Sequence, residues 1–327
     1  MRVIVAQTGR PVLIVAPLGV RREFFREAAE RFRGDFTVDL RFIQSDAEVT
    51  GPAIYLTNYE PVRDGKLTAR HFVGVSLDEA AVLRGMGGTK TFRTFIRTFM
   101  EVEYRFVATA TPSPNDYIEL LSYAGFLDVM DIGQAKTRFF KRNSEKADAL
   151  TLMQHKEQEF WLWVASWALF VTRPSDLDPA FDDIGYDLPP LDVRWHELPD
   201  EGGIEFERSG QGNFLPEVKI DLSGLAKRKR ENLPARMAKL MDLRAEDPAA
   251  HRIIWHDLEA ERAALERAIP RLASVYGAQA LDAREEIIGD FAEGRLAELA
   301  AKPVMLGSGT NLQRHCAWSI FLGIGFK

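Results

Sequence analysis

The first half of the chain alternates short apolar runs with amphipathic stretches. Residues 11–16 form a continuous run rich in β-branched side chains, as a strand buried on both faces requires. Residues 20–32 instead place apolar side chains at helical spacing, with Arg and Glu between them. Further runs of strand length follow at 38–43, 53–57, 72–77 and 104–108. This alternation predicts parallel βαβ units and a doubly wound sheet, in which ligands bind at the carboxyl ends of strands.

The pattern changes after this region and then returns. Residues 115–172 predict mostly helix, and the stretch rich in Asp, Pro and Gly at 174–190 predicts a connector. A second series of strands and helices then begins, with strands predicted at 251–255, 272–276, 303–306 and 319–323 and helices at 258–268 and 282–291. We therefore expect an α/β protein with a first parallel-sheet lobe over 1–127, a helical insert and connector over 128–185, and a second lobe over 186–327.

Composition narrows the setting without assigning a function. The longest apolar run, residues 160–171, is shorter than the roughly 20 residues of a membrane span. The chain opens without a basic and apolar signal segment, and its single cysteine, Cys316, excludes an internal disulfide framework. We expect a cytoplasmic protein without a membrane partner. The net charge of -6 leaves nucleic-acid binding open, because a groove needs only local positive charge.

Two adjacent carboxylates follow the predicted strand at 72–77. In nucleotide hydrolases, an Asp at this position holds Mg²⁺ through its water shell, and the following Glu orients and deprotonates the attacking water. Asp78 and Glu79 fit these roles. The dipeptide alone fits equally well an acidic helix start that complements the macrodipole.

Hydroxyl side chains follow the next predicted strand, at 104–108. Thr109 and Thr111 would lie beside the acidic pair in a parallel sheet, where they could couple the metal site to the second lobe. The simpler reading is a strand exit with solvated hydroxyls.

Six segments, taken in order, resemble the motor core of superfamily 2 helicases, and most closely the Swi/Snf-type double-stranded DNA translocases with their phage and prophage relatives. The segments that resemble motifs Ia, Ib, II, III, IV and V are 13–20 (LIVAPLGV), 55–60 (YLTNYE), 77–81 (LDEAA), 107–115 (VATATPSPN), 253–256 (IIWH) and 307–313 (GSGTNLQ).

This resemblance implies two RecA-like lobes that bind ATP and Mg²⁺ and move on nucleic acid. It favours translocation along duplex DNA over strand separation. It implies that Asp78 and Glu79 are catalytic, with Asp78 holding Mg²⁺ through water. Nucleotide coupling is assigned to Thr109, Thr111 and Gly309. The residues implied to bind nucleic acid are Pro17, Leu18, Thr57, Asn58, Tyr59, Trp255, His256, Thr310 and Asn311. Phage relatives of this kind suggest a DNA-methylase or restriction partner.

Departures from the family pattern concern the ATPase site. The family places a Gly-x-x-x-x-Gly-Lys-Ser/Thr loop before motif Ia, and the sequence has none there; residues 85–91 have Gly and Lys in the wrong order. The arginine-bearing motif VI is also not found, and Ala80 and Ala81 stand where the family often has His or Ser. We therefore predict incomplete lobes and impaired hydrolysis. The alternatives are a catalytically inactive nucleic-acid-binding module and an RNA helicase.

For three other features, a structural interpretation competes with a functional one. Trp161, Trp163 and Trp167 predict a helix packed on the first lobe rather than a base-stacking platform. The basic run at 227–230 fits a phosphate clamp or a solvated helix start equally well. His315 and Cys316 lack the further ligands of a metal site.

Overall fold

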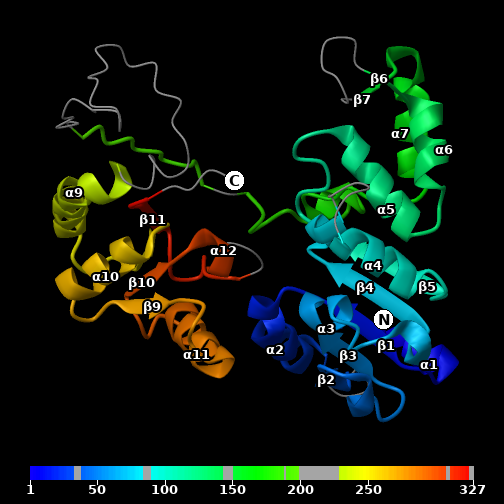
Figure 1. Cartoon of the computed structure of the whole chain (residues 1–327), viewed down its shortest axis with the longest axis horizontal. Helices are drawn as coiled ribbons and strands as arrows, with labels where there is room; N and C mark the ends of the chain where they lie inside the picture. Colours follow the sequence, from blue (N-terminus) through cyan, green and yellow to red (C-terminus); the bar gives the residue numbers. More distant parts are fainter. Residues whose placement is uncertain are drawn as a thin grey trace, which may run out of the picture. The chain divides into compact units, whose positions relative to one another are not determined.

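The computed structural model describes residues 1–32, 38–83, 90–142, 150–187, 189–198, 228–306 and 310–323. Two compact units divide the chain, Met1–Pro190 and Leu191–Lys327. Each contains a parallel sheet with helices packed on it (Figure 1). The predicted α/β class with two parallel-sheet lobes is therefore confirmed.

The first unit is built on a five-stranded sheet in the order β2-β3-β1-β4-β5. Its strands, all parallel to their neighbours, are β1 (Val12–Val15), β2 (Leu40–Phe42), β3 (Ile54–Thr57), β4 (Gly74–Asp78) and β5 (Tyr104–Ala108). The central strand β1 is almost wholly buried, which explains its uninterrupted apolar run. Its Val15 is aligned with Thr57 on one side and with Leu77 on the other.

Helices and turns connect these strands and cover the sheet. The helices are α1 (Arg2–Thr8), α2 (Arg21–Arg31), α3 (Tyr59–Arg63), α4 (Lys90–Phe99), α5 (Leu120–Phe126), α6 (Ile132–Phe139) and α7 (Glu157–Ala165). An antiparallel hairpin of β6 (Phe140–Arg142) and β7 (Leu150–Leu152) interrupts the region predicted to be mostly helical. Short 3-10 turns lie at Leu18–Val20, Asp46–Glu48, Ala69–His71, Ala80–Leu83, Tyr117–Glu119, Gln154–Lys156 and Pro174–Asp176. No helix among the described residues is long and apolar enough to span a bilayer.

The segment expected as an insert, 128–185, lies within the first unit. Phe160 of α7 is fully buried and makes edge contacts with Phe139 and Phe140, at ring-centroid distances of 5.4 and 5.7 Å. These rings belong to the same buried cluster as the β-strand residues Leu13 and Val75. Because the three tryptophans Trp161, Trp163 and Trp167 pack against that cluster, their predicted core role is confirmed.

The second unit contains a four-stranded parallel sheet in the order β11-β8-β10-β9. Its strands are β8 (Arg252–Trp255), β9 (Ala273–Val275), β10 (Glu298–Ala301) and β11 (Trp318–Phe321). Its helices are α9 (Leu233–Glu246), α10 (Glu259–Ala268), α11 (Leu281–Ala292) and α12 (Pro303–Leu306).

The strand predicted at 303–306 is wrong. These residues form the short helix α12, and the strand β10 lies just before them. Pro303 has no N–H for a ladder, and its fixed φ suits a first helical turn. Val304 is 69% exposed, so this apolar run is not a buried strand, whereas the small side chains of Ala300 and Ala301 are fully buried in the sheet.

A buried ion pair connects α9 to α10 in the second unit. Arg236 donates to Oε1 of Glu261 at 2.6 Å and to the carbonyl of Leu322 at 2.6 Å. Oε2 of Glu261 accepts the amides of Asp257 and Leu258 at 2.7 and 2.9 Å. Burial alone would raise the pKa of Glu261, but these donors together lower it.

The packing of α7 predicts a sharp difference between two of its residues. Phe160→Ala leaves a cavity in the first core and should lower the free energy of unfolding by about 3–5 kcal/mol. Leu162→Ala, on the exposed side of the same helix, should change it by less than about 0.5 kcal/mol. Urea denaturation of both variants checks this, and equal losses would refute the assignment of α7 to the core.

The buried carboxylate predicts a second effect on stability. Glu261→Gln replaces an accepting oxygen with an NH₂ donor that would face either Arg236 or two backbone amides. The free energy of unfolding of the second unit should therefore fall by about 2–4 kcal/mol. Because the pKa of Glu261 is lowered on folding, the wild-type contribution is present above the ordinary glutamate pKa and is lost as pH falls through the folded value. Thermal unfolding across pH 3–7 measures both, and a variant as stable as wild type at pH 7 would contradict the expectation.

Candidate functional site

The acidic pair forms a sharp corner where β4 ends. Asp78 is the last residue of β4, and Glu79 follows with φ of 49°, in the left-handed region that non-glycine residues rarely adopt. The chain then turns inward, so that Ala80 and Leu83 are fully buried. A polar side chain at position 80 would lie in this core, which explains why alanine stands there.

Tyr59 lies against the main chain of this corner. Its hydroxyl is within hydrogen-bonding distance of the carbonyl oxygens of Asp78 and Glu79, with the second at 3.1 Å. Its ring packs against Phe95 of α4, with centroids 5.6 Å apart. The sequence resemblance assigned Tyr59 to nucleic-acid binding, and no pattern in the sequence indicates this contact with the acidic pair.

Thr109 lies beside Glu79, as the parallel arrangement predicts. Asp78 is aligned with Ala108 of β5, so the residues one position further along meet at the sheet edge. The Thr109 hydroxyl donates to Oε1 of Glu79 at 3.4 Å and accepts the amide of Thr111 at 3.2 Å. The structure therefore places Thr109 beside the acidic pair, whereas Thr111 takes part through its backbone amide.

The corner is electrostatically suited to a cation. Burial raises the pKa of Asp78; the Glu79 amide partly opposes this rise, and the Glu79 carboxylate adds to it. Burial also raises the pKa of Tyr59 far above its ordinary range, with the charges of Asp78 and Glu79 adding, so its hydroxyl remains a donor. In the described part of the chain, no group of three or more His, Cys, Asp or Glu side chains could hold a metal. The single half-buried carboxylate of Asp78 fits Mg²⁺, which keeps most of its water ligands.

The residues of the first unit predicted to bind nucleic acid lie at the carboxyl ends of β1 and β3, at the same edge of the sheet. Pro17 and Leu18 are half-buried. Thr57 and Asn58 are only 1% and 5% exposed, and the Asn58 amide donates to Glu60. The side chains of Thr57 and Asn58 are therefore not available to a ligand in this arrangement.

In the second unit, the residues predicted to bind nucleic acid also range from buried to exposed. Trp255 stacks on Phe321 with centroids 6.1 Å apart, and His256 is fully buried, with a pKa lowered by burial and by the charge of Lys302. Thr310 donates to the Leu306 carbonyl at 2.7 Å, whereas Asn311 is exposed. Gly309 lies outside the described residues.

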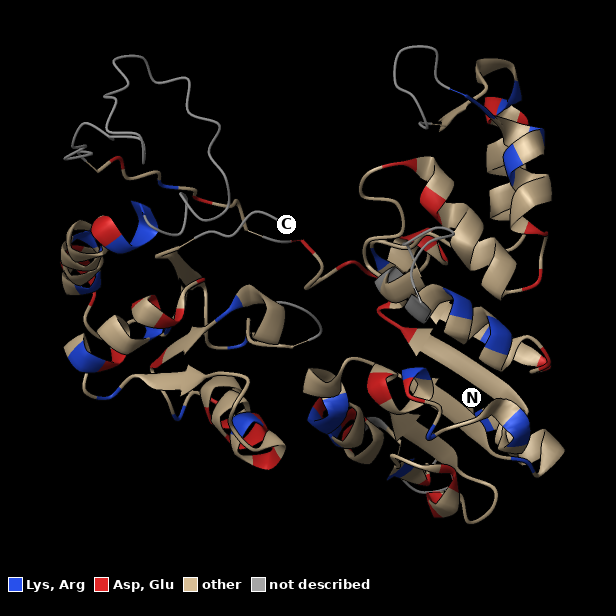
Figure 2. Ribbon diagram, in the orientation of Figure 1, with Lys and Arg blue, Asp and Glu red and all other residues tan. Residues whose placement is uncertain are grey.

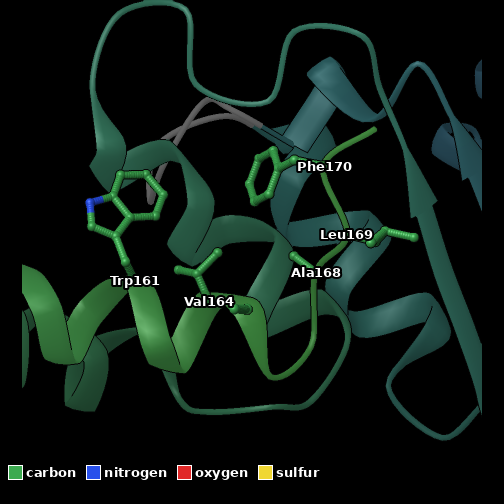
Figure 3. A pocket seen from close by; sticks show the side chains of 6 residues that line it. Trp161, Val164, Ala168, Leu169 and Phe170 are labelled. Carbon is green, nitrogen blue, oxygen red and sulfur yellow. The ribbon is translucent and has the colours of Figure 1, made fainter. Parts of the chain in front are cut away.

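An apolar hollow lies at the end of α7 (Figure 3). It has a volume of about 410 Å³ and is lined by Trp161, Val164, Ala165, Ala168, Leu169 and Phe170. No side chain in this lining is acidic, basic or nucleophilic, so the hollow has no groups for catalysis. The chemistry-bearing residues of the first unit gather instead at the carboxyl edge of its sheet.

No family model and no curated protein sequence matches the chain. Among solved structures, it is similar to the Sulfolobus solfataricus SWI2/SNF2 ATPase core in complex with dsDNA, at 16% identity and a TM-score of 0.43, covering 99% of this chain and 80% of that one. It is also similar to S. cerevisiae Dbp5 bound to RNA and ADP BeF3, at 11% identity and a TM-score of 0.47, covering 97% of this chain and 63% of that one. With TM-scores below 0.5, these likenesses assign no function to the chain.

The raised pKa of Asp78 predicts that this residue destabilises the fold when ionised. Its folded pKa lies above the ordinary value of 3.8, so stability falls as pH rises from that value through the folded pKa. Asp78→Asn should therefore be more stable than wild type at pH 7, and the gain should vanish near pH 3. Thermal unfolding from pH 3 to 7 measures this. Asp64→Asn, an exposed site paired with Arg63, should give no such gain; a loss of stability in Asp78→Asn at pH 7 would contradict the prediction.

Proposed function

We propose that this chain is the core of an ATP-dependent motor that moves on nucleic acid, with duplex DNA as its track. The observation that supports this best is the corner at the carboxyl end of β4, where Asp78, Glu79 and Thr109 meet. Carboxyl ends of parallel strands are where such folds bind ligands. An acidic pair held there, with a hydroxyl on one carboxylate, suits phosphoryl transfer to water.

Each residue of the corner has a distinct task in this proposal. Bound Mg²⁺ would supply positive charge to the phosphates of ATP. Asp78 would hold the water shell of the cation, and Glu79 would orient a water molecule and accept its proton. The Thr109 hydroxyl donates to the Glu79 carboxylate, which fixes its direction, and the Thr111 amide fixes Thr109 in turn. Thr109, Thr111 and Gly309 would link this corner to the second lobe.

Basic side chains on α4, a helix that contacts the turn after the corner, support a polyanionic track. Helix α4 has the sequence KTFRTFIRTF, without an acidic residue, and Figure 2 shows its basic positions. Arg93 and Arg97 lie on its exposed side, while Phe92, Phe95 and Phe99 are buried. The helix contacts α3 and the 3-10 turn that follows Glu79. Contacts to phosphates through such side chains would be independent of sequence.

Duplex DNA is the proposed track because the resemblance is to Swi/Snf-type translocases. A DNA-methylase or restriction protein is the proposed partner on the same ground. In the second unit, the exposed Asn311 and its neighbour Thr310 are the residues proposed to reach the nucleic acid.

The alternative of an inactive binding module is favoured by one feature of the sequence. It contains no Gly-x-x-x-x-Gly-Lys-Ser/Thr loop, and the lysine of that loop supplies much of the charge that stabilises the transferring phosphate. Binding to nucleic acid without turnover would follow.

ATP hydrolysis with duplex DNA, single-stranded DNA or RNA separates these functions. It should be measured on this chain and on a version extended at both ends. Where hydrolysis occurs, we expect duplex DNA to stimulate it, Glu79→Gln to lower kcat by about 100-fold or more, and Asp78→Asn to lower it similarly. Glu101→Gln, an exposed carboxylate just after α4, is the matched control and should change little.

Three outcomes would contradict the proposed DNA-dependent motor. Stimulation by RNA alone identifies an RNA helicase. Tight DNA binding with no hydrolysis in either version identifies the inactive module. Hydrolysis that is unaffected by Glu79→Gln rejects the motor proposal.

A further inference from the structure

We propose that Tyr59 is a positioning residue that holds the Asp78–Glu79 corner in its left-handed turn and so aims the Glu79 carboxylate at Thr109. The catalytic consequence of this role rests on the proposed function. The role itself rests on three features of the first unit: the contacts of the Tyr59 hydroxyl, the fixed position of its ring and the backbone conformation of Glu79.

The hydroxyl of Tyr59 is placed to bond the backbone of the corner and not its side chains. It reaches the carbonyl oxygens of Asp78 and Glu79, which lie 19 and 20 residues further along the chain. A hydroxyl has one hydrogen, so it can donate to either carbonyl and not to both at once. Because both acceptors belong to consecutive residues, either bond limits rotation of the peptide units that flank Glu79.

The ring of Tyr59 is held so that its hydroxyl cannot easily leave. Tyr59 is the first residue of α3, directly after the buried Asn58 at the end of β3. Its ring packs against Phe95, which is fully buried in α4, and against the same core cluster as the strands. The anchor therefore comes from a neighbouring part of the sheet and not from the corner itself.

The backbone of Glu79 requires such support. Among the described residues, only Glu79 and Asp128 are non-glycine residues with positive φ. That conformation costs about as much as one protein hydrogen bond contributes. Loss of the hydroxyl would let the peptide rotate, and the carboxylate would move away from the Thr109 hydroxyl, now 3.4 Å from it.

Tyr55, which lies in β3 just before α3, offers a matched control for Tyr59. Its hydroxyl also bonds the main chain, accepting the Thr50 amide at 2.9 Å and donating to the Gly51 carbonyl at 3.0 Å. Its ring is fully buried, as is fitting for a structural tyrosine. Tyr59→Phe and Tyr55→Phe thus each remove one hydroxyl that bonds the main chain of the first unit, and only the first removal affects the corner.

Amide hydrogen exchange tests the contact without any need for turnover. Tyr59→Phe should speed exchange over residues 78–80 about five- to tenfold, with the rest of the unit unchanged. Tyr55→Phe should speed exchange near residues 50 and 51 and leave 78–80 as in wild type. If exchange at 78–80 is the same in Tyr59→Phe as in wild type, the inference is rejected, whether or not the chain hydrolyses ATP.

Steady-state kinetics tests the positioning in whichever version of the protein hydrolyses ATP. Tyr59→Phe should lower kcat about tenfold and leave KM for Mg-ATP within about twofold, because the loss is one of orientation. Tyr55→Phe should leave both constants near wild type. Equal kcat values for Tyr59→Phe and wild type would overturn the positioning role, while loss of function in Glu79→Gln would still uphold the motor.

Discussion

The parallel pairing of β1, β3, β4 and β5 is the constraint on which the candidate site depends. Parallel strands end at the same edge, so residues far apart in sequence are brought together only because of this direction. The alignment of Asp78 with Ala108 places Glu79 and Thr109 at neighbouring positions just beyond the ladder. An antiparallel β5 would present the start of that strand at this edge, and Thr109 would lie at the opposite one.

The sheet brings the acidic pair to its edge, but local forces decide its geometry. Burial of Ala80 and Leu83 draws the chain inward directly after Glu79, which favours a tight turn there but leaves the peptide units around Glu79 to be held by other contacts. The turn places Glu79 in an unfavourable backbone region and leaves Asp78 partly shielded from water, which raises its pKa. Both effects destabilise the fold locally. Such costs are common where a site must hold charged groups in a fixed direction.

Much of the fold could be predicted from the sequence, because hydrophobic periodicity reports burial. The uninterrupted run at 11–16 gave the central strand, and the helical spacing at 20–32 gave α2. The prediction of a strand at 303–306 was wrong because it relied on the apolar run and did not take account of Pro303, the first residue of that run. The hairpin of β6 and β7 was missed because its strands have only three residues each, too few for hydrophobic periodicity to separate strand from helix.

The candidate site could be predicted in part for a similar reason. Residue type and position after a strand placed Asp78, Glu79 and Thr109 together, and the structure agrees. The sequence could not show that Thr57 and Asn58 are buried, because a polar residue at the end of a strand gives the same sequence pattern whether its side chain is buried or exposed to solvent. Nor could it show the contact of Tyr59, which depends on how α3 packs against α4.

Electrostatics limits what the corner can do by itself. Asp78 and Glu79 are both acidic, and the phosphates of a nucleotide are negative as well, so the corner can orient water and a cation but cannot attract a nucleotide. That attraction has to come from a divalent cation and from basic side chains. The sequence has no phosphate-binding loop of the Gly-Lys-Ser/Thr kind, and on α4 the exposed basic side chains are Arg93 and Arg97. In the proposed motor, the corner would therefore supply orientation, and affinity for nucleotide and nucleic acid would have to come from residues outside it.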